Sequence, residues 1–434
     1  MRVRRWGDLS ADDRNRLLDR RAVRDPQVEE SVRSIVESVR REGDAALLRF
    51  TRELDGVDLD ERGLRVSAGE IVAATDRVPP EVREALDVAM ERIRRFHERQ
   101  QPPHLWMEEF AGMRAGELTW PIESAGLYVP RGKGSFPSVM AMLGIPATVA
   151  GVPRIVVATP PNPDGSVDAA ALHVAGRLGI EHVFRVGGAQ AIAAMAYGTE
   201  TVPAMSKLFG PGSPYVVAAK AAVAADVDIG LRAGPSESLV YADGSVDPEV
   251  IALDLCNEAE HGPDSTAILV TTEDALVAAV SERVEAVVER LGDPRAGYVK
   301  RVLEGDGGAI VFPDEDSAVE FISAIPVEHL VLDVADPHSI VERIRYAGEI
   351  IIGPNTPIGA CNFVCGPNAV LPTSGFSRSM SGLSTRDFLR TSAVIELSAE
   401  GLESVQGPAA ILAEYEGFPA HAMAVRRRAS GSAG

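Results

Sequence analysis

Alternating strands and helices run through the middle of this chain, and this pattern constrains its fold more than any other feature. Short apolar segments read as strands at 154–161, 182–186, 266–272, 308–313 and 329–334. Longer segments between them read as helices at 168–180, 187–198, 273–292 and 314–325. Strands that alternate with helices build parallel sheets. The sequence therefore predicts an α/β protein with two such units, although no sequence repeat proves a duplication.

The N-terminal third reads as helical. Apolar residues recur at steps of three and four, at Val28, Val32, Ile35 and Val39. Asp25 is a suitable N-cap for this helix, and a second helix is expected over 79–103, bracketed by prolines. The last ten residues, VRRRASGSAG, are small and polar, and we expect them to be disordered.

Composition excludes several classes of function. The chain has 434 residues, 45% of them hydrophobic, and a formal net charge of −20. Such an acidic chain is unsuited to binding the phosphate backbone of nucleic acids or an anionic membrane surface. The N-terminal MRVRRWGDLS has no apolar segment of a secretory signal after it, and no apolar run reaches the length of a membrane span. We therefore expect a cytoplasmic protein.

The chain has three cysteines, Cys256, Cys361 and Cys365. An odd and small number of cysteines in a long chain does not make a disulfide framework. We read them as small buried hydrophobic residues.

A first polar cluster lies in DLCNEAEHGPDS, residues 254–265. Glu258 and His261 are three residues apart, so they share one face of a helix that Gly262 and Pro263 end. Such a pair can provide two ligands to a zinc-like ion. A solvated helix end, with a histidine favourable to the helix dipole, explains the same residues. This fragment alone leaves both interpretations open.

A second polar pair, Glu328 and His329, stands just before an apolar strand in IPVEHLVLDV. Adjacent residues of an extended chain face opposite ways, so a structural pair would bury only one of them. At the mouth of a strand, both could face a cleft. A histidine and a carboxylate of raised pKa are suited to proton transfer there.

Glycine-rich turns precede two of the expected helices. VGGAQAI and LFGPGSPYVVAAK place backbone N–H groups at helix N-termini, where a phosphate can bind. Neither segment has the spacing of a Rossmann or Walker motif.

Nine short segments occur in an order that resembles the histidinol dehydrogenase family. They are GLYVPRGKGSFPS, IPATVAGV, GGAQAIAAMAYGTETVP, GPG, AGPSE, AEHGPDS, EHL, VLPTSG and EGFPAH. The resemblance implies two incomplete Rossmann-like parallel-sheet domains with helical N-terminal and C-terminal extensions. It also implies a homodimer in which C-terminal parts complete the partner's site. The family binds one zinc per site and oxidises an amino alcohol through the aldehyde to the acid with two NAD in succession.

On this basis we expect four parts. Residues 1–24 form an N-terminal extension, 25–125 with 236–380 a discontinuous first α/β domain, 126–235 a second α/β domain, and 381–434 a dimer-contact segment and tail.

The family's metal positions fall on Glu258, His261, Asn362 and His421. The family has a glutamine where this chain has Glu258, and an aspartate where it has Asn362. Together the two changes move the carboxylate from one ligand position to the other and keep the ligand charge at −1. We interpret this as a retained divalent metal site, with zinc the expected ion; a relict site without an ion is the alternative.

The remaining roles also follow from the resemblance. They are catalysis for Glu328 and His329, substrate binding for Ser236 and Glu416 together with the metal ligands, and cofactor binding for Tyr128, Gln190 and Ser213. Ser213 replaces an asparagine, and Ala369 replaces a histidine that lies near the substrate in the family.

The expected activity is therefore an NAD-dependent oxidation of a small-molecule alcohol such as L-histidinol, in which His329 takes the hydroxyl proton and Glu328 activates water. A paralogue acting on another small amino or hydroxy alcohol, and a non-catalytic binding protein on the same fold, are the alternatives.

Overall fold

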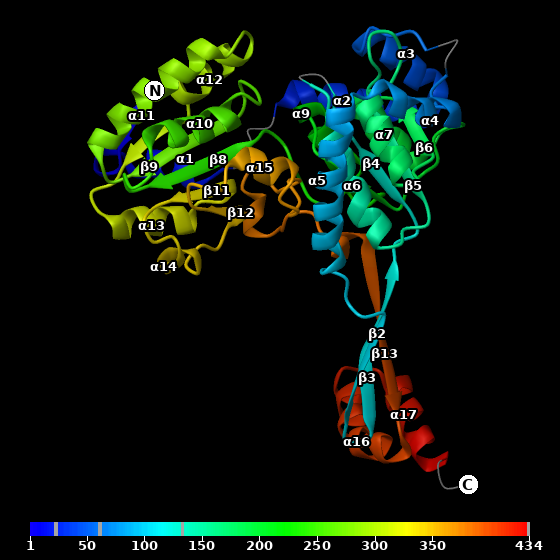
Figure 1. Ribbon diagram of the computed structural model, residues 1–434. Helices are drawn as coiled ribbons and strands as arrows, with labels where there is room; N and C mark the ends of the chain where they lie inside the picture. Colours follow the sequence, from blue (N-terminus) through cyan, green and yellow to red (C-terminus); the bar gives the residue numbers. More distant parts are fainter. Residues whose placement is uncertain (21–24, 60–62, 132–133, 432–434) are drawn as a thin grey trace.

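The computed structural model describes residues 1–20, 25–59, 63–131 and 134–431. They form two α/β units that lie side by side, and a narrow arm that projects from one of them (Figure 1). The predicted α/β class with parallel sheets is confirmed. None of the helices in the described ranges combines the length and apolarity that a membrane crossing needs.

The larger unit is built on a six-stranded parallel sheet. Its strands, in spatial order, are β1 (Val3–Arg5), β10 (Gly308–Val311), β9 (Thr266–Thr271), β8 (Glu237–Ala242), β11 (Val327–Asp333) and β12 (Ala347–Ile352). One face packs against α10 (Pro248–Ala259), α11 (Asp274–Arg290), α12 (Arg295–Glu304) and α15 (Ile358–Phe363). The other face packs against α1 (Ala11–Leu18), α13 (Glu315–Ala324) and α14 (His338–Val341). The central strands β8 and β11 are thus covered on both faces.

The smaller unit has a four-stranded parallel sheet, in the order β6 (His182–Arg185), β5 (Ile155–Thr159), β4 (Ala125–Tyr128) and β7 (Lys207–Phe209). One face carries α4 (Ala68–Arg77), α5 (Pro80–Glu98), α6 (Pro137–Val149) and α7 (Ala169–Arg177). The opposite face carries α2 (Pro26–Glu42), α3 (Asp44–Leu54), α8 (Gly188–Tyr197) and α9 (Pro214–Val223).

The expected first helix is α2, and its start is the predicted one. The side chain of Asp25 accepts a hydrogen bond from the backbone N–H of Gln27, and proline stands in the first turn. The apolar face buries Val32, Ile35 and Val39 against the smaller unit. Helix α5 confirms the second prediction and buries its own apolar face there as well.

This packing differs from the expected grouping of residues 25–125 with 236–380. The apolar stripes of α2 and α5 cover the two faces of the small sheet, so residues 26–59 and 63–98 belong to the smaller unit. The first residues are not a separate extension either. Strand β1 pairs with β10 and forms one edge of the large sheet.

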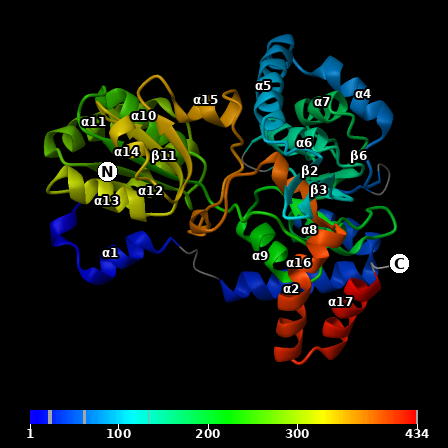
Figure 2. The ribbon, with the colours of Figure 1, turned by 90° about the horizontal axis from the view of Figure 1, so that it is seen from below.

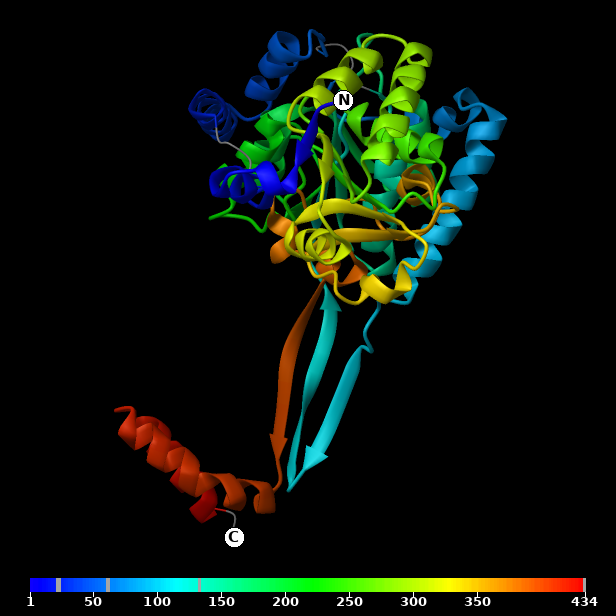
Figure 3. The same ribbon diagram turned by 90° about the vertical axis from the view of Figure 1, so that its left-hand side faces the viewer.

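The arm joins two distant parts of the chain. Strands β2 (Leu105–Phe110) and β3 (Met113–Pro121) pair antiparallel with each other, and β3 pairs with β13 (Leu389–Leu397). Helices α16 (Ala399–Tyr415) and α17 (Pro419–Gly431) follow at the tip, far from both sheets (Figures 1 and 3).

Seen from below, α16 and α17 lie beneath the smaller unit (Figure 2). The prediction of a disordered tail is wrong as far as Gly431, because α17 continues to that residue. Residues 432–434 lie outside the described part.

Candidate active site

Glu328 and His329 both lie inside β11 rather than before it, and both are buried, with 7% and 3% of their surface exposed. Adjacent residues of a strand start toward opposite faces, but the ends of these two side chains approach each other to 3.8 Å. The expectation that only one could be buried fails because helices cover both faces of this central strand. The pair therefore sits in the interior, where charged groups are rarely found without a function or a partner.

Each member of the pair has a defined contact. Oε2 of Glu328 accepts a hydrogen bond of 2.9 Å from the backbone N–H of Glu237, at the start of β8. Nδ1 of His329 lies 2.9 Å from Oε2 of Glu349 on β12. Nε2 of His329 lies 3.8 Å from Oε1 of Glu328. These contacts gather at the amino ends of three neighbouring strands.

Burial and charge shift both proton affinities in the same direction. Burial raises the pKa of Glu328 well above its ordinary value; His329 opposes this shift, and the charges of Glu258 and Glu237 add to it. Burial alone would lower the pKa of His329, but the hydrogen bond with Glu349 and the charges of Glu328 and Glu258 raise it to about 9. The free protein therefore holds a proton on His329 at neutral pH.

Glu258 belongs to this group, whereas its helical neighbour His261 does not. Glu258 is 1% exposed, and its Oε2 has no hydrogen-bond partner within the described ranges. Helix α10 ends at Ala259, and His261 follows it with an exposed side chain. In a single chain, His261 therefore fits the interpretation as a solvated helix end. Glu258 is instead a buried carboxylate with one oxygen that makes no hydrogen bond in the described ranges.

The other expected metal ligands lie elsewhere in the chain. Asn362 is partly exposed on α15, on the same face of the large sheet as α10. His421 is exposed at the tip of the arm, near the turn between α16 and α17, and Glu416 lies at the same turn. Within the part of the chain that the structure describes, no three His, Cys, Asp or Glu residues are placed to hold a metal. A complete ligand set would need residues from a second chain.

The segment VLPTSG closes one side of the group. The N–H of Ser374 donates 3.2 Å to Oε1 of Glu237, and the N–H of Gly234 donates 2.7 Å to Oγ1 of Thr373. Ser236 lies between these contacts, and its carbonyl accepts from the N–H of Thr266. Ser236 is thus held beside the start of β8, and its substrate role stays a prediction.

Ala369 is partly buried and packs against the apolar cluster of the smaller unit. It provides no polar atom to its surroundings.

Three residues of the group were missed by sequence reasoning: Arg20, Glu237 and Glu349. Nη2 of Arg20 donates to Oε1 of Glu237 at 3.2 Å and to Oγ1 of Thr266 at 2.8 Å. Glu237 and Glu349 each belong to an otherwise apolar strand. A carboxylate within a segment that must be buried is the signal that could have found them, because its burial is costly without a partner.

The three expected cofactor residues gather at the carboxyl edge of the small sheet. Tyr128 ends β4, and its hydroxyl oxygen accepts 3.1 Å from the N–H of Gly188 at the start of α8. Gln190 is 1% exposed, and its Oε1 has no partner in the described ranges. Ser213 is the exposed N-cap residue of α9. The carboxyl edge of a parallel sheet is where nucleotides bind in α/β folds.

The turn before α8 fits a phosphate in detail. Gly188 has φ of +60°, and a Cβ there would lie 2.7 Å from Oε1 of Gln190. A Cβ on Gly187 would lie 2.6 Å from Pro160. Glycines therefore suit this turn, which lies at a helix N-terminus, where backbone N–H groups can bind a phosphate; the N–H of Gly188 donates to Tyr128. The residues present fit a dinucleotide.

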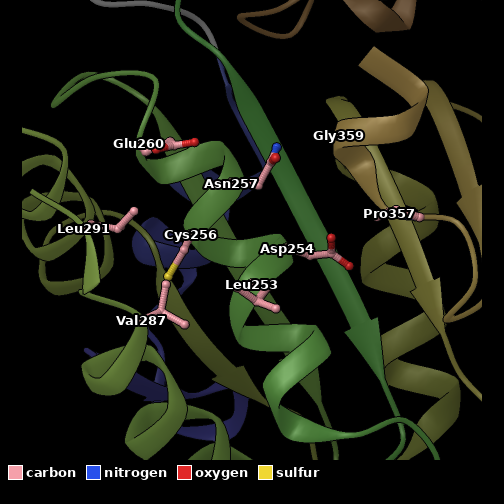
Figure 4. Close-up of a pocket in the computed structure, with 9 residues that line it drawn as sticks. All are labelled: Leu253, Asp254, Cys256, Asn257, Glu260, Val287, Leu291, Pro357 and Gly359. Atoms are coloured by element: carbon pink, nitrogen blue, oxygen red, sulfur yellow. The ribbon is translucent and has the colours of Figure 1, made fainter. Parts of the chain in front are cut away.

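A separate pocket of about 250 Å³ lies beside α10 (Figure 4). Its polar residues include Asp254 and Asn257, whose side chains both point toward α15. Burial and the charge of Asp333 raise the pKa of Asp254 to about 7. The catalytic candidates Glu328 and His329 do not line this pocket, so the pocket is distinct from the buried cluster around these two residues.

A family model described as histidinol dehydrogenase matches residues 18–429. The chain belongs to the histidinol dehydrogenase family. Members of this family are NAD-dependent oxidoreductases that act on CH–OH groups. The predicted resemblance is confirmed over nearly the whole chain.

Similar proteins support this assignment. The chain is 45% identical to histidinol dehydrogenase homolog 2 of Mesorhizobium japonicum, over 96% of this chain and 95% of that protein. It is 42% identical to histidinol dehydrogenase of a Synechocystis species, over 98% and 99%. The crystal structure of histidinol dehydrogenase from Elizabethkingia anophelis superposes with a TM-score of 0.93 at 32% identity, covering 100% of this chain and 98% of that one. The fold is thus that of the family.

Proposed function

We propose that this protein oxidises a small amino or hydroxy alcohol through the aldehyde to the acid, with Glu328 and His329 as its proton-transfer pair. The observation that carries the proposal is the burial of both side chains, in contact, among further carboxylates at one edge of a sheet. A binding protein without chemistry has no need of such a pair, since burying it costs stability.

In this function, the two side chains act on different protons. Nε2 of His329 faces Glu328 and is free of other partners within the described ranges, so it takes the proton of the substrate hydroxyl. Glu328, with its raised pKa, then takes a proton from the water that attacks the aldehyde. Tyr128, Gln190 and the turn before α8 would hold NAD, which would supply a hydride acceptor for both oxidations.

The residues also fit a divalent metal, with zinc as the expected ion. Glu258, His261, Asn362 and the partner subunit's His421 would hold it, with Glu258 providing its unused buried oxygen. Carboxylate, imidazole and amide donors are suitable for zinc. When bound, the ion supplies positive charge that polarises the substrate's oxygen.

The arm supports a homodimer with shared sites. Its strands and helices expose many large apolar side chains, a surface that monomeric proteins rarely leave open. They are Leu105, Trp106, Phe110, Trp120, Ile395, Leu397, Ile411, Leu412, Tyr415, Phe418 and Met423. We infer that a second copy of this chain covers this surface. The same docking would bring Glu416 and His421 to the partner's substrate site.

L-histidinol is the first candidate substrate, because the family and several relatives carry its name. A different small alcohol is the second candidate. Positions 258, 362 and 369 favour this second candidate. The side chain of Ala369 offers no polar atom to a substrate. Among the expected metal ligands, the carboxylate stands at position 258 and not at position 362. We expect weak turnover of histidinol and faster turnover of an alcohol that lacks one of its polar groups.

The test combines NADH formation with metal analysis. The full-length protein, purified with added zinc, is incubated with NAD and a panel of L-histidinol, other amino alcohols and hydroxy alcohols. We expect NADH from at least one alcohol and close to one equivalent of metal per chain. Protein that binds NAD but oxidises no alcohol would favour the non-catalytic alternative. Less than a tenth of an equivalent of metal would contradict the metal site.

A further inference from the structure

Glu349 and His329 face each other across two adjacent strands. In the parallel pairing of β11 with β12, His329 lies directly opposite Glu349. Aligned residues on neighbouring parallel strands point to the same face of the sheet, about 4.8 Å apart. Backbone geometry therefore brings the two side chains together before any side-chain rotation is considered. Their contact, 2.9 Å between Nδ1 and Oε2, is a consequence of the register.

The contact is protected from water. The side chains of His329 and Glu349 are 4% and 13% exposed. A hydrogen bond with an ionised acceptor is strong where water is excluded. The hydrogen bond from Nδ1 to Glu349 on β12 thus fixes the rotamer of the His329 imidazole.

The bond also decides which nitrogen reacts. A carboxylate accepts hydrogen bonds, so Nδ1 carries the proton and Nε2 carries the lone pair of the neutral ring. Nε2 is the atom that lies 3.8 Å from Oε1 of Glu328, on the side of the ring that faces the other buried carboxylates. The opposite tautomer would direct the lone pair toward Glu349, away from the expected substrate.

We propose that Glu349 is a positioning residue, which holds His329 in the tautomer and orientation that take the substrate's proton. The inference rests on the proposed function of His329. In the first oxidation the substrate O–H bond breaks and its proton moves to Nε2 as the C–H hydride leaves for NAD. The imidazolium that results keeps its second proton on Nδ1. Oε2 of Glu349 accepts the hydrogen bond from Nδ1 throughout and stabilises this cation.

A purely structural role for Glu349 makes different predictions. Its charge also acts on the buried thiol of Cys361, so its removal could disturb α15 without affecting catalysis directly. In that case a variant would lose stability, and binding and turnover would decline together. A positioning role instead lowers kcat, leaves KM nearly unchanged and alters the titration of His329. The titration of His329 is also influenced by the charges of Glu328 and Glu258, which remain in place in each variant.

The first test is kinetic, on the full-length protein with the alcohol that it oxidises best. We expect Glu349→Gln to lower kcat by about 10²–10³-fold, since loss of the carboxylate behind a catalytic histidine costs up to about 10⁴ in other enzymes. KM should change by less than about threefold. Glu349→Asp should restore at least tenfold of the loss because it restores the charge. The matched control is Asp333→Asn, a buried carboxylate on the same face of β11 that does not contact His329; it should keep kcat within about threefold.

The second test needs no turnover. Protein labelled at histidine Cε1 and the ring nitrogens is titrated by NMR, with His329→Gln used to assign the signal among the 8 histidines. Wild type should show the proton on Nδ1 of the neutral ring. In Glu349→Gln the pKa of His329 should fall, because the acceptor that stabilises the imidazolium is gone. The limb of the rate profile that rises with pH should move to lower pH with it.

The outcomes separate the two levels of the argument. If wild type oxidises alcohols and Glu349→Gln keeps its kcat and pH profile, the positioning role is wrong and the proposed function stands. If wild type oxidises no alcohol, the proposed function is wrong, and the NMR titration alone decides whether Glu349 sets the tautomer. An unchanged titration in both Glu349→Gln and Glu349→Asp overturns the inference in either case.

Discussion

Replacing Glu258 with glutamine separates a retained metal site from a relict one. The carboxylate is 1% exposed, its Oε2 has no partner within the described ranges, and its charge acts on Glu328 and His329. In the absence of metal, a buried and incompletely paired charge destabilises the fold. With metal bound, the same oxygen becomes a ligand. The substitution should therefore change stability with opposite sign in the two conditions.

The magnitudes follow from these two roles. Removing the buried negative charge should stabilise the metal-free protein by about 1–3 kcal/mol. Losing a ligand should weaken metal binding by roughly 100-fold, which lowers the stabilisation by saturating metal by about 2.7 kcal/mol. Glu258→Gln should thus melt a few degrees higher than wild type in chelator. It should gain much less from added zinc.

Thermal unfolding of both proteins, with chelator and with zinc, measures these differences. Glu260→Gln is the matched control, because Glu260 is two residues away, is partly exposed and carries the same chemical change. It should leave the zinc response as in wild type. A Glu258→Gln protein that is less stable in chelator and responds to zinc as wild type does would refute the reasoning.

Three further predictions concern the reaction and the assembly. His329→Ala should lower kcat by about 10²–10⁴-fold. The kcat/KM of wild type should rise about tenfold per pH unit up to pH about 9, because the pKa of His329 is raised to about 9 and the base must lose its proton. A profile that is flat from pH 6 to 9 would contradict this role. His329→Ala and His421→Ala chains should each be inactive alone. When they are unfolded and refolded together at equal concentrations, half of the dimers are mixed and each mixed dimer has one intact site, so roughly a quarter of wild-type activity should return. No recovery, with dimers present in the mixture, would exclude a shared site. The triple variant Ala369→His, Glu258→Gln and Asn362→Asp should gain about 5- to 150-fold in kcat/KM for L-histidinol relative to the best wild-type substrate; unmodified protein that already oxidises histidinol efficiently would make these three residues a tolerated variation.

Sequence periodicity identified strands β5, β6, β9, β10 and β11 and helices α7, α8, α11 and α13, because apolar residues must cover the faces of a buried sheet. It did not identify strands β1, β4, β7 and β12. It could not assign α2 and α5 to the correct unit. An amphipathic helix specifies which of its faces is buried, and not which sheet receives that face. The arm was missed for a related reason. Its strands β3 and β13 are far apart in the sequence, and their pairing is visible only in three dimensions.

The candidate site was predictable where chemistry is written in local sequence. Glu328 and His329 stood out as polar residues in apolar surroundings, and the structure places them together in the interior. Glu237 and Glu349 escaped notice because single carboxylates at the starts of apolar strands are common. Only the register of β11 with its neighbours shows that Glu349 lies opposite His329 and that Glu237 lies beside Glu328.

The ratio of NADH formed to alcohol consumed tests the central claim most directly. Two successive oxidations depend on one buried pair, with His329 needed for the first and Glu328 for the water that enters the second. Wild type should form two NADH per alcohol consumed, and Glu328→Gln should form one and release the aldehyde. His329→Ala should consume almost no alcohol in the same time. A wild-type protein that forms no NADH from any alcohol, or a Glu328→Gln variant that still forms two at the wild-type rate, would contradict the account.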